Sequence, residues 1–254
     1  MSFRVTVLGS GTIIPSAERR STALLVEAGE RTILFDCGPG APDALAEAGF
    51  SFRDLGEIFL THYHPDHTLG LGHLLAAINV DPVSRRRGKL KLYGPRGLAD
   101  FVSKWQALYH STVPKWDFLE LVEIGPGVVP GTEEAVVSAS SASHGDAAAL
   151  SYRVAYKEKS VVYTGDASYS DSLVELARDA DLLVAECSFP DDREVEGHLT
   201  PSSVGRLAAA AAARHVVLVH MYPLFDDESP AGRVKRHYRG SVEVGYDGLE
   251  FAIE

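Results

Sequence analysis

The stretch that decides the architecture of this chain is Thr61-His62-Tyr63-His64-Pro65-Asp66-His67. It follows the short apolar segment Glu57–Leu60, which is typical of a buried strand, and a helix is predicted to begin near its aspartate. The first two histidines, two residues apart, can point the same way from an extended loop, while the aspartate and the third histidine face a neighbouring point. Imidazole and carboxylate groups are the ligands that a zinc-like ion prefers, so we expect a metal site here.

Three further candidate ligands stand where apolar strands stop in the second half of the chain. They are His144 after the predicted strand Ala135–Ala139, Asp166 after Ser160–Thr164, and His220 after His215–Val219. One such residue is more often a packed or surface side chain. Three of them at strand ends, in the half that lacks the first ligand cluster, predict the remainder of a two-metal centre.

Both halves of the sequence show hairpins followed by alternating helices and strands, which predicts an α/β fold of two packed sheets with helices outside. The other predicted strands are Arg4–Leu8, Ala23–Glu27, Arg31–Asp36, Lys89–Tyr93, Ser151–Tyr156 and Leu182–Ala185. The predicted helices are Pro42–Ala48, Gly97–Tyr109, Asp171–Arg178 and Pro201–Ala213, besides the one near Asp66. No linker divides the chain, so we expect one domain, 1–254, of two similar halves, about 1–125 and 126–254.

Composition narrows the class of protein. The 254 residues carry a formal charge of −11, which argues against a long nucleic acid as partner, because such partners are bound mainly through basic faces. The densest basic run, Arg85-Arg86-Arg87, is interpreted as a solvated loop. With two cysteines, no signal peptide and no membrane-spanning apolar run, the sequence predicts a cytoplasmic protein with reduced thiols and no membrane contact.

The complete series His62-x-His64-x-Asp66-His67, His144, Asp166 and His220 resembles the ligand series of the metallo-β-lactamase superfamily. The openings Leu8-Gly9-Ser10-Gly11-Thr12 and Leu34-Phe35-Asp36-Cys37-Gly38 are similar to the start of that superfamily. The segment Gly197-His198-Leu199-Thr200-Pro201 resembles its ribonuclease Z and phosphodiesterase branch. The resemblance covers nearly the whole chain and implies an αββα sandwich, in which two mixed β-sheets are flanked by helices.

Two departures from that branch bear on the substrate. Only 21 residues, positions 145–165, separate His144 from Asp166, which leaves no room for the long flexible arm that holds transfer RNA in many ribonuclease Z enzymes. Pro65 stands where the family usually has glycine. Transfer RNA is therefore not the expected partner, and the chain looks like the smaller phosphodiesterases without an arm.

The resemblance also implies roles for individual residues. His62, His64 and His144 would hold one metal, Asp66, His67 and His220 the other, and Asp166 would bridge them. The expected cofactors are two divalent ions, zinc by default, with manganese, iron, cobalt or nickel as alternatives. Asp66 is also a candidate catalytic residue that orients or deprotonates a hydroxide shared by the metals. His198 is the other: it stabilises a phosphate oxygen, protonates the leaving group, or is a surface residue before a helix.

The sequence leaves several alternatives open. The first is a phosphodiesterase for a small or nucleotide-like substrate; the second is an ester hydrolase such as a lactonase, phosphotriesterase or arylsulfatase-like enzyme. The third is a metal-containing binding protein with little turnover. Asp36 is interpreted equally as an acceptor for a ligand histidine or as a turn residue. The apolar segment Leu69–Ile78 suggests a homodimer surface, and Tyr222, Trp105 and Trp116 are candidates to line the pocket.

Overall fold

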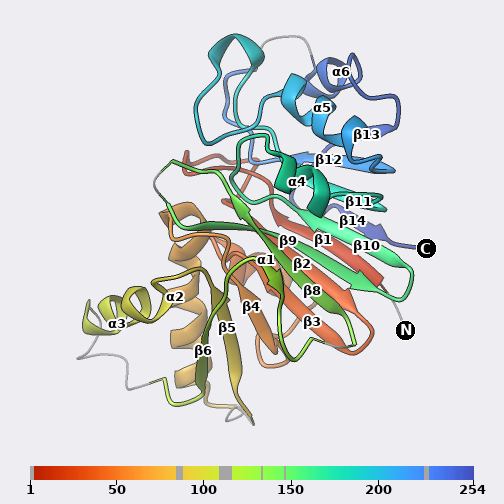
Figure 1. Cartoon of the computed structure of the whole chain (residues 1–254). Helices are drawn as coiled ribbons and strands as arrows, with labels where there is room; N and C mark the ends of the chain where they lie inside the picture. The colour runs from red at the N-terminus through yellow and green to blue at the C-terminus, as the bar shows by residue number, and fades with distance from the viewer. Residues whose placement is uncertain (1–2, 84–87, 109–115, 133, 146, 226–228) are drawn as a thin grey trace.

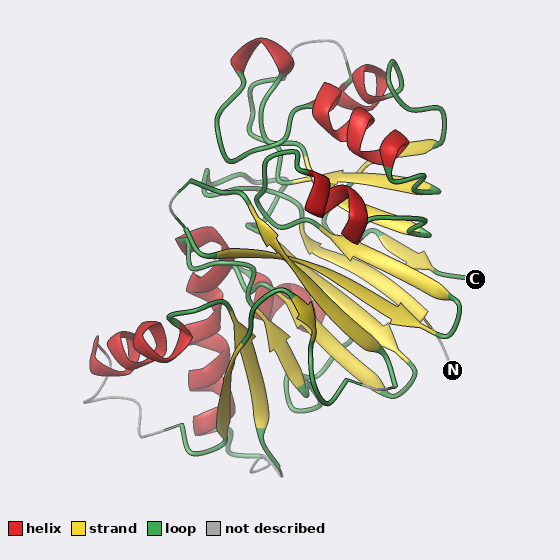
Figure 2. Ribbon diagram, in the orientation of Figure 1, coloured by secondary structure: helices red, strands yellow, loops and turns green. Residues whose placement is uncertain are grey.

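The computed structural model describes the whole chain apart from residues 1–2, 84–87, 109–115, 133, 146 and 226–228 (Figures 1 and 2). The predicted basic run Arg85-Arg86-Arg87 lies outside the described residues. Two seven-stranded sheets form the centre of the molecule. Among the described residues, no helix has the length and apolar character that crossing a membrane requires.

The first sheet has the strand order β14-β1-β2-β3-β4-β5-β6. Its strands are β1 (Phe3–Gly9), β2 (Ala23–Ala28), β3 (Arg31–Phe35), β4 (Glu57–Phe59), β5 (Leu90–Gly94), β6 (Leu119–Glu123) and β14 (Glu250–Ala252). The helices against its outer face are α1 (Ala41–Glu47), α2 (Pro65–Val80) and α3 (Leu98–Leu108). The chain therefore completes the first sheet with a strand from its C-terminal end.

The second sheet has the order β13-β12-β11-β10-β9-β8-β7. Its strands are β7 (Gly127–Val128), β8 (Val136–Ala142), β9 (Ala149–Tyr156), β10 (Lys159–Tyr163), β11 (Leu182–Glu186), β12 (His215–Val219) and β13 (Ser241–Val244). The helices α4 (Asp171–Leu176), α5 (Pro201–Ala210) and α6 (Pro230–Val234) pack on its outer face, and a short 3₁₀ turn, η1, spans Asp191–Arg193. Figure 1 shows α2 and α3 far from α5 and α6, on the opposite side of the sheets.

The fold has four layers, two sheets inside and a layer of helices on the outer face of each. The alternation of side chains along the strands explains this arrangement. Successive side chains of a strand point to opposite faces, so a strand buried on both faces feeds two cores. In β2, Leu24 and Val26 enter the core between the sheets, whereas Leu25 packs against the outer helices. In β11, Val184 enters the same central core and Leu183 packs under α4 and α5. The αββα sandwich and the α/β class predicted from the sequence are confirmed.

Several boundaries differ from the prediction. Strand β8 runs on to Ala142, beyond the predicted end at Ala139. Helix α5 stops at Ala210 rather than Ala213, because the backbone turns left-handed at Ala212, where φ is 52°. The predicted end of the third helix, Tyr109, lies outside the described residues. The elements β6, β7, β13, β14 and α6 are not predicted from the sequence, because they are short or carry little period-two alternation.

The apolar residues of α2 face inward. Leu71, Leu74, Leu75 and Ile78 are buried in the core under the first sheet, whereas Leu69, at 50% exposure, and Val80, at the end of the helix, are open to solvent. This segment therefore does not form the apolar dimer surface suggested above, and a homodimer stays a prediction without this support. Trp116 is buried in the same core and Trp105 packs against it, so both contribute to packing.

One close backbone contact positions α2, the helix that begins inside the histidine stretch. A Cβ added to Gly70 would lie 2.2 Å from the carbonyl oxygen of Gly38. The amide of Gly70 donates to the carbonyl of Cys37 at 2.9 Å, and the amide of Cys37 donates to that of His67 at 2.8 Å. Only glycine allows the helix to approach the chain after β3 this closely.

We expect Gly70→Ala to destabilise the protein by about 1–3 kcal/mol, because the added methyl must push rigid backbone apart. The measurement is urea unfolding followed by circular dichroism. The control is Gly232→Ala in α6, where a Cβ would meet nothing within 4 Å. That change should be neutral or stabilise the helix by up to about 1 kcal/mol. Equal stabilities for the two variants would show that the contact at Gly70 is not tight.

Candidate metal centre

The histidine stretch takes its shape from the start of α2. His64 is the residue before the helix, with an extended backbone (φ −64°, ψ 151°), and Pro65 occupies the first helical position. Proline suits this position because its fixed φ is helical and its missing N–H would have no partner there. The proline that replaces the usual glycine therefore starts the helix. His62 and His64 project from the loop, and Asp66 and His67 from the first turn.

Three other site residues follow strands that pair in parallel with a neighbour, and the carboxyl ends of such strands meet at one edge of a sheet. Asp36 follows β3, Asp166 follows β10 and His220 follows β12. The backbone turns sharply at these points: φ is +57° at Asp36, +53° at His220, and +55° at Gly165, just before Asp166. Non-glycine residues rarely adopt this left-handed conformation, and such strain concentrates at functional sites.

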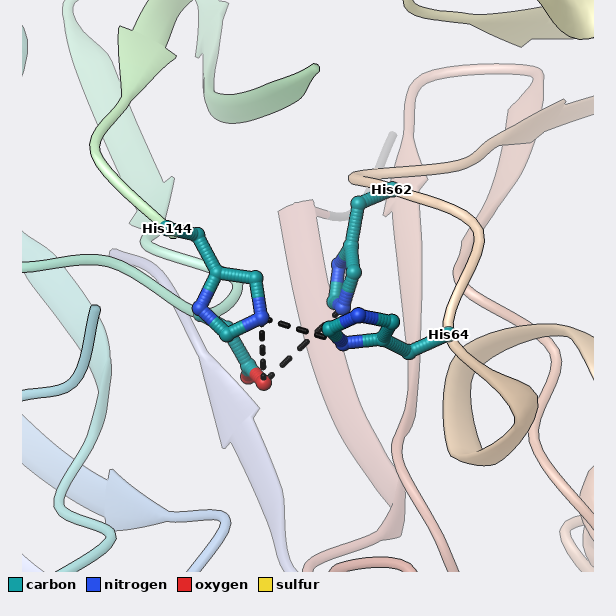
Figure 3. A group of neighbouring side chains, drawn as sticks. His62, His64 and His144 are labelled. Carbon is teal, nitrogen blue, oxygen red and sulfur yellow. Dashed lines mark hydrogen bonds and ion pairs between the residues drawn. The ribbon is translucent and has the colours of Figure 1, made fainter. Parts of the chain in front are cut away.

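One group of side chains joins both halves of the chain. The Nε2 atom of His144 lies 3.0 Å from Nδ1 of His64 and 3.8 Å from Oδ2 of Asp166. The Nε2 atom of His62 lies 3.9 Å from the same Asp166 oxygen. Figure 3 shows the three imidazole rings converging on one point, with His62 and His64 on one segment and His144 on another. The structure thus brings together the four residues that the sequence analysis assigned to the first metal.

A second group lies on the other side of Asp166. The Oδ1 atom of Asp166 is 3.3 Å from Nε2 of His67 and 3.5 Å from Nε2 of His220. The same nitrogen of His220 is 3.2 Å from Oδ2 of Asp66. The two oxygens of Asp166 therefore face different groups of candidate ligands.

The outward ring nitrogens of four histidines have protein partners. These pairs are His62 with Thr61 Oγ1 at 3.0 Å, His67 with Asp36 Oδ2 at 2.8 Å, His144 with the carbonyl of Gly197 at 2.9 Å, and His220 with Ser188 Oγ at 2.9 Å. Each contact uses Nδ1 and turns Nε2 toward the centre. Such partners fix the orientation of a ligand histidine and raise its basicity. Of the two interpretations of Asp36, the geometry matches the acceptor.

The residues present fit a pair of cations. Three buried atoms at the centre have no hydrogen-bond partner among the described residues: Nε2 of His62, Nε2 of His67 and Oδ1 of Asp166. Buried polar atoms without partners are costly and call for an ion or a water. In each group, the candidate ligand atoms lie within 4.8 Å of one another. Nitrogen and carboxylate donors in this number suit zinc and similar divalent metals.

The electrostatics of the centre favour positive charge. Burial lowers the pKa of His67, but the carboxylates of Asp166 and Asp36 outweigh burial and hold it well above its ordinary value. Burial raises the pKa of Asp166, yet His220, His67 and His62 keep it well below the usual range. In contrast, burial holds the pKa of His62 well below its ordinary value.

His198 lies beside this centre and is oriented by Glu186, to which the sequence assigned no role. Its Nδ1 atom lies 3.1 Å from Oε2 of Glu186, which is 1% exposed. Glu186 also accepts from the amide of Ala167 at 2.7 Å and from the hydroxyl of Ser188. Burial lowers the pKa of His198, but Glu186 and then Asp166 more than offset it, so the pKa is raised. The available signal was that Glu186 ends an apolar strand, as the strand-end candidates do.

Two further residues are sequence neighbours of this centre: Cys187, between Glu186 and Ser188, and Tyr222, two residues after His220. Cys187 is fully buried, and burial together with Glu186 raises the pKa of its thiol well above the ordinary value, which rules out a reactive thiolate. Tyr222 does approach the centre, with its ring 6.1 Å from that of His220.

The fold and this cluster define a hydrolase of the metallo-β-lactamase type. The model of the family described as beta-lactamase superfamily domain matches residues 31–221, and the chain belongs to that family. Among its relatives, ribonuclease Z of Methanosarcina acetivorans is 26% identical over 304 aligned residues, covering 99% of this chain and 98% of the relative. The probable metallo-hydrolase YhfI of Bacillus subtilis is 27% identical over 253 residues, covering 97% and 98%.

Two solved structures share this fold. The crystal structure of the metallo-beta-lactamase fold protein YhfI from Bacillus subtilis superposes with a TM-score of 0.86 at 24% identity, covering 99% of this chain and all of that one. The short form of human tRNase Z gives a TM-score of 0.78 at 26% identity, covering 99% of both chains.

Replacing Asp36 by Asn should weaken metal binding about 10- to 100-fold, because His67 loses the carboxylate that orients it. Chelator competition on the purified protein measures this affinity. The control is Asp100→Asn: Asp100 is an exposed carboxylate paired with Lys104 on α3, and its loss should leave the affinity unchanged. Equal affinities in all three proteins would contradict the supporting role of Asp36.

Proposed function

We propose that the chain is a dinuclear metal-dependent hydrolase that cleaves phosphodiester bonds in a small or nucleotide-like substrate. The observation that carries the proposal is the position of the Asp166 carboxylate. Its two oxygens face separate groups of histidines. His62, His64 and His144 would hold one ion, and Asp66, His67 and His220 the other. Zinc suits this donor set, which also accepts manganese, iron, cobalt or nickel.

When bound, two divalent ions lower the pKa of a shared water and neutralise charge on phosphoryl oxygens. The protein supplies the proton acceptor and the orientation. Asp66 lies at the centre with its Oδ2 atom 3.2 Å from His220, so it can accept a proton there. His198, 13% exposed in its side chain, has Nδ1 committed to Glu186. Its Nε2 atom is thereby left to donate to a phosphate oxygen or to the leaving group.

Chain length supports a small substrate. The alignment to the Methanosarcina ribonuclease Z spans 304 positions, against 254 residues in this chain, so the relative carries inserted segments. The alignment to YhfI spans only 253. Here β9 and β10 join through a tight turn at Lys157 and Glu158, and no other element is inserted in that hairpin. A chain without an arm has less surface for a transfer RNA, and its charge of −11 would repel one.

Purified protein should contain about two metal ions per chain and hydrolyse bis(p-nitrophenyl) phosphate in a chelator-sensitive way, because both ligand groups must be filled. Elemental analysis and the assay use the same batch. Two metals with turnover of lactones, phosphotriesters or aryl sulfates but not of diesters would overturn the proposed substrate. Cleavage of a transfer-RNA precursor at a higher kcat/KM would do the same.

His198→Ala should lower kcat/KM for bis(p-nitrophenyl) phosphate about 100-fold more than for p-nitrophenyl acetate. The two substrates share a leaving group, so the difference reports contact with the phosphate. Metal content serves as the control, because His198 is not assigned as a ligand and the variant should keep both ions. An equal loss on both substrates would contradict the phosphate contact.

A further inference from the structure

A cavity of about 430 Å³ opens beside the metal centre. One wall is the loop after β1, from Gly11 to Arg19, and the other is the segment after β12, from Met221 to Phe225. Among the described residues, Pro230 and Val244 also line it. Its volume lies within the range of small-molecule sites.

Tyr222 lies between the cavity and the candidate site. This residue lines the cavity, and its ring lies 6.1 Å from that of His220. On its other side it stacks on Phe189 at 4.7 Å, and Phe189 lies 5.3 Å from His198. A molecule whose reacting group sits between His198 and His220 can therefore extend past Tyr222 into the cavity.

The lining is mostly apolar. Ile14, Pro15, Met221, Pro223 and Phe225 contribute hydrocarbon surface, and Glu18 and Arg19 are the charged residues that line it. The Arg19 guanidinium already donates to Ser10 Oγ at 2.8 Å and to the carbonyl of Gly245 at 2.7 Å. A polyanion such as RNA would find little compensation for its phosphates here, whereas an apolar group would lose its contact with water.

The first wall is held in place before any substrate arrives. Asp247 accepts from the amide and the hydroxyl of Ser10 at 2.9 and 2.7 Å, and from the amide of Arg20 at 2.7 Å. The amide of His220 donates to the carbonyl of Ser10 at 2.8 Å, which ties the loop to the candidate ligand. Within the loop, Ile14 is 46% exposed and faces the cavity, so it contacts solvent until something covers it.

We propose that this cavity binds the apolar organic group of the substrate, so that the enzyme prefers phosphoesters with an aryl or similarly sized hydrocarbon substituent. The inference rests on the proposed function, since it places the phosphate at the metal centre and the substituent past Tyr222. Ile14 and Met221 then determine specificity, and their contact with the substituent adds affinity in proportion to the apolar area buried.

Titration calorimetry of the metal-loaded protein with phenylphosphonate and methylphosphonate tests this assignment. Both carry the same phosphonate head, and only phenylphosphonate fills the cavity, so it should bind at least about tenfold more tightly. Ile14→Asn should reduce that ratio about three- to fivefold while leaving methylphosphonate binding unchanged. Ile13→Asn is the matched control: Ile13 is 41% exposed, adjacent in sequence and not part of the lining, so the ratio should stay at the wild-type value.

The outcomes separate the two proposals. If both phosphonates bind the wild-type protein equally, or if the two Asn variants have the same ratio, the cavity assignment is wrong and the phosphoester function stands. If neither phosphonate binds a protein that holds its metals, the phosphoester function fails, and the cavity assignment fails with it.

Discussion

The carboxylate of Asp166 is the point on which the rest of the structure depends. One of its oxygens faces His62 and His144, and the other faces His67 and His220. These four histidines come from both sheets of the sandwich. The arrangement therefore exists only when the two sheets are stacked in one register, so the site and the sheet–sheet core form together.

Asp36 shows how that register is secured. Its buried carboxylate accepts from the amide of Thr61 at 2.8 Å and from His67 at 2.8 Å, both in the first half of the chain. It also accepts from the hydroxyl of Tyr163 on β10, at 2.8 Å. A further contact across the layers runs from the hydroxyl of Tyr152 to the carbonyl of Leu60, at 2.7 Å. Polar contacts in a dry interior have strict geometry, so they define one alignment of sheets that apolar packing alone would specify loosely.

Beside the centre, Glu186 is a second buried carboxylate that contacts several residues at once. Glu186 is satisfied by Ala167, Ser188 and His198. Ser188, which donates to Glu186, also contacts Nδ1 of His220. The Glu186 carboxylate therefore orients both a candidate ligand, His220, and a candidate acid, His198. These contacts make Glu186 a candidate positioning residue for both histidines. The apolar cavity beside Tyr222 is built largely from loops, the part of a fold in which specificity commonly lies.

Much of the fold and of the candidate metal centre could be predicted from the sequence alone. Apolar periodicity predicted most central strands and the helices between them, and the clustered histidines with the strand-end residues indicated a two-metal centre, because period and spacing are local properties. The edge strands β6, β7, β13 and β14 could not be predicted from the sequence. They are strands because each pairs with a neighbouring strand, and their own residue patterns do not indicate it. Glu186, the acceptor role of Asp36 and the cavity at Ile14 and Tyr222 were likewise decided by the tertiary structure. Each joins residues far apart in sequence, and only the stacking of the two sheets brings them within contact.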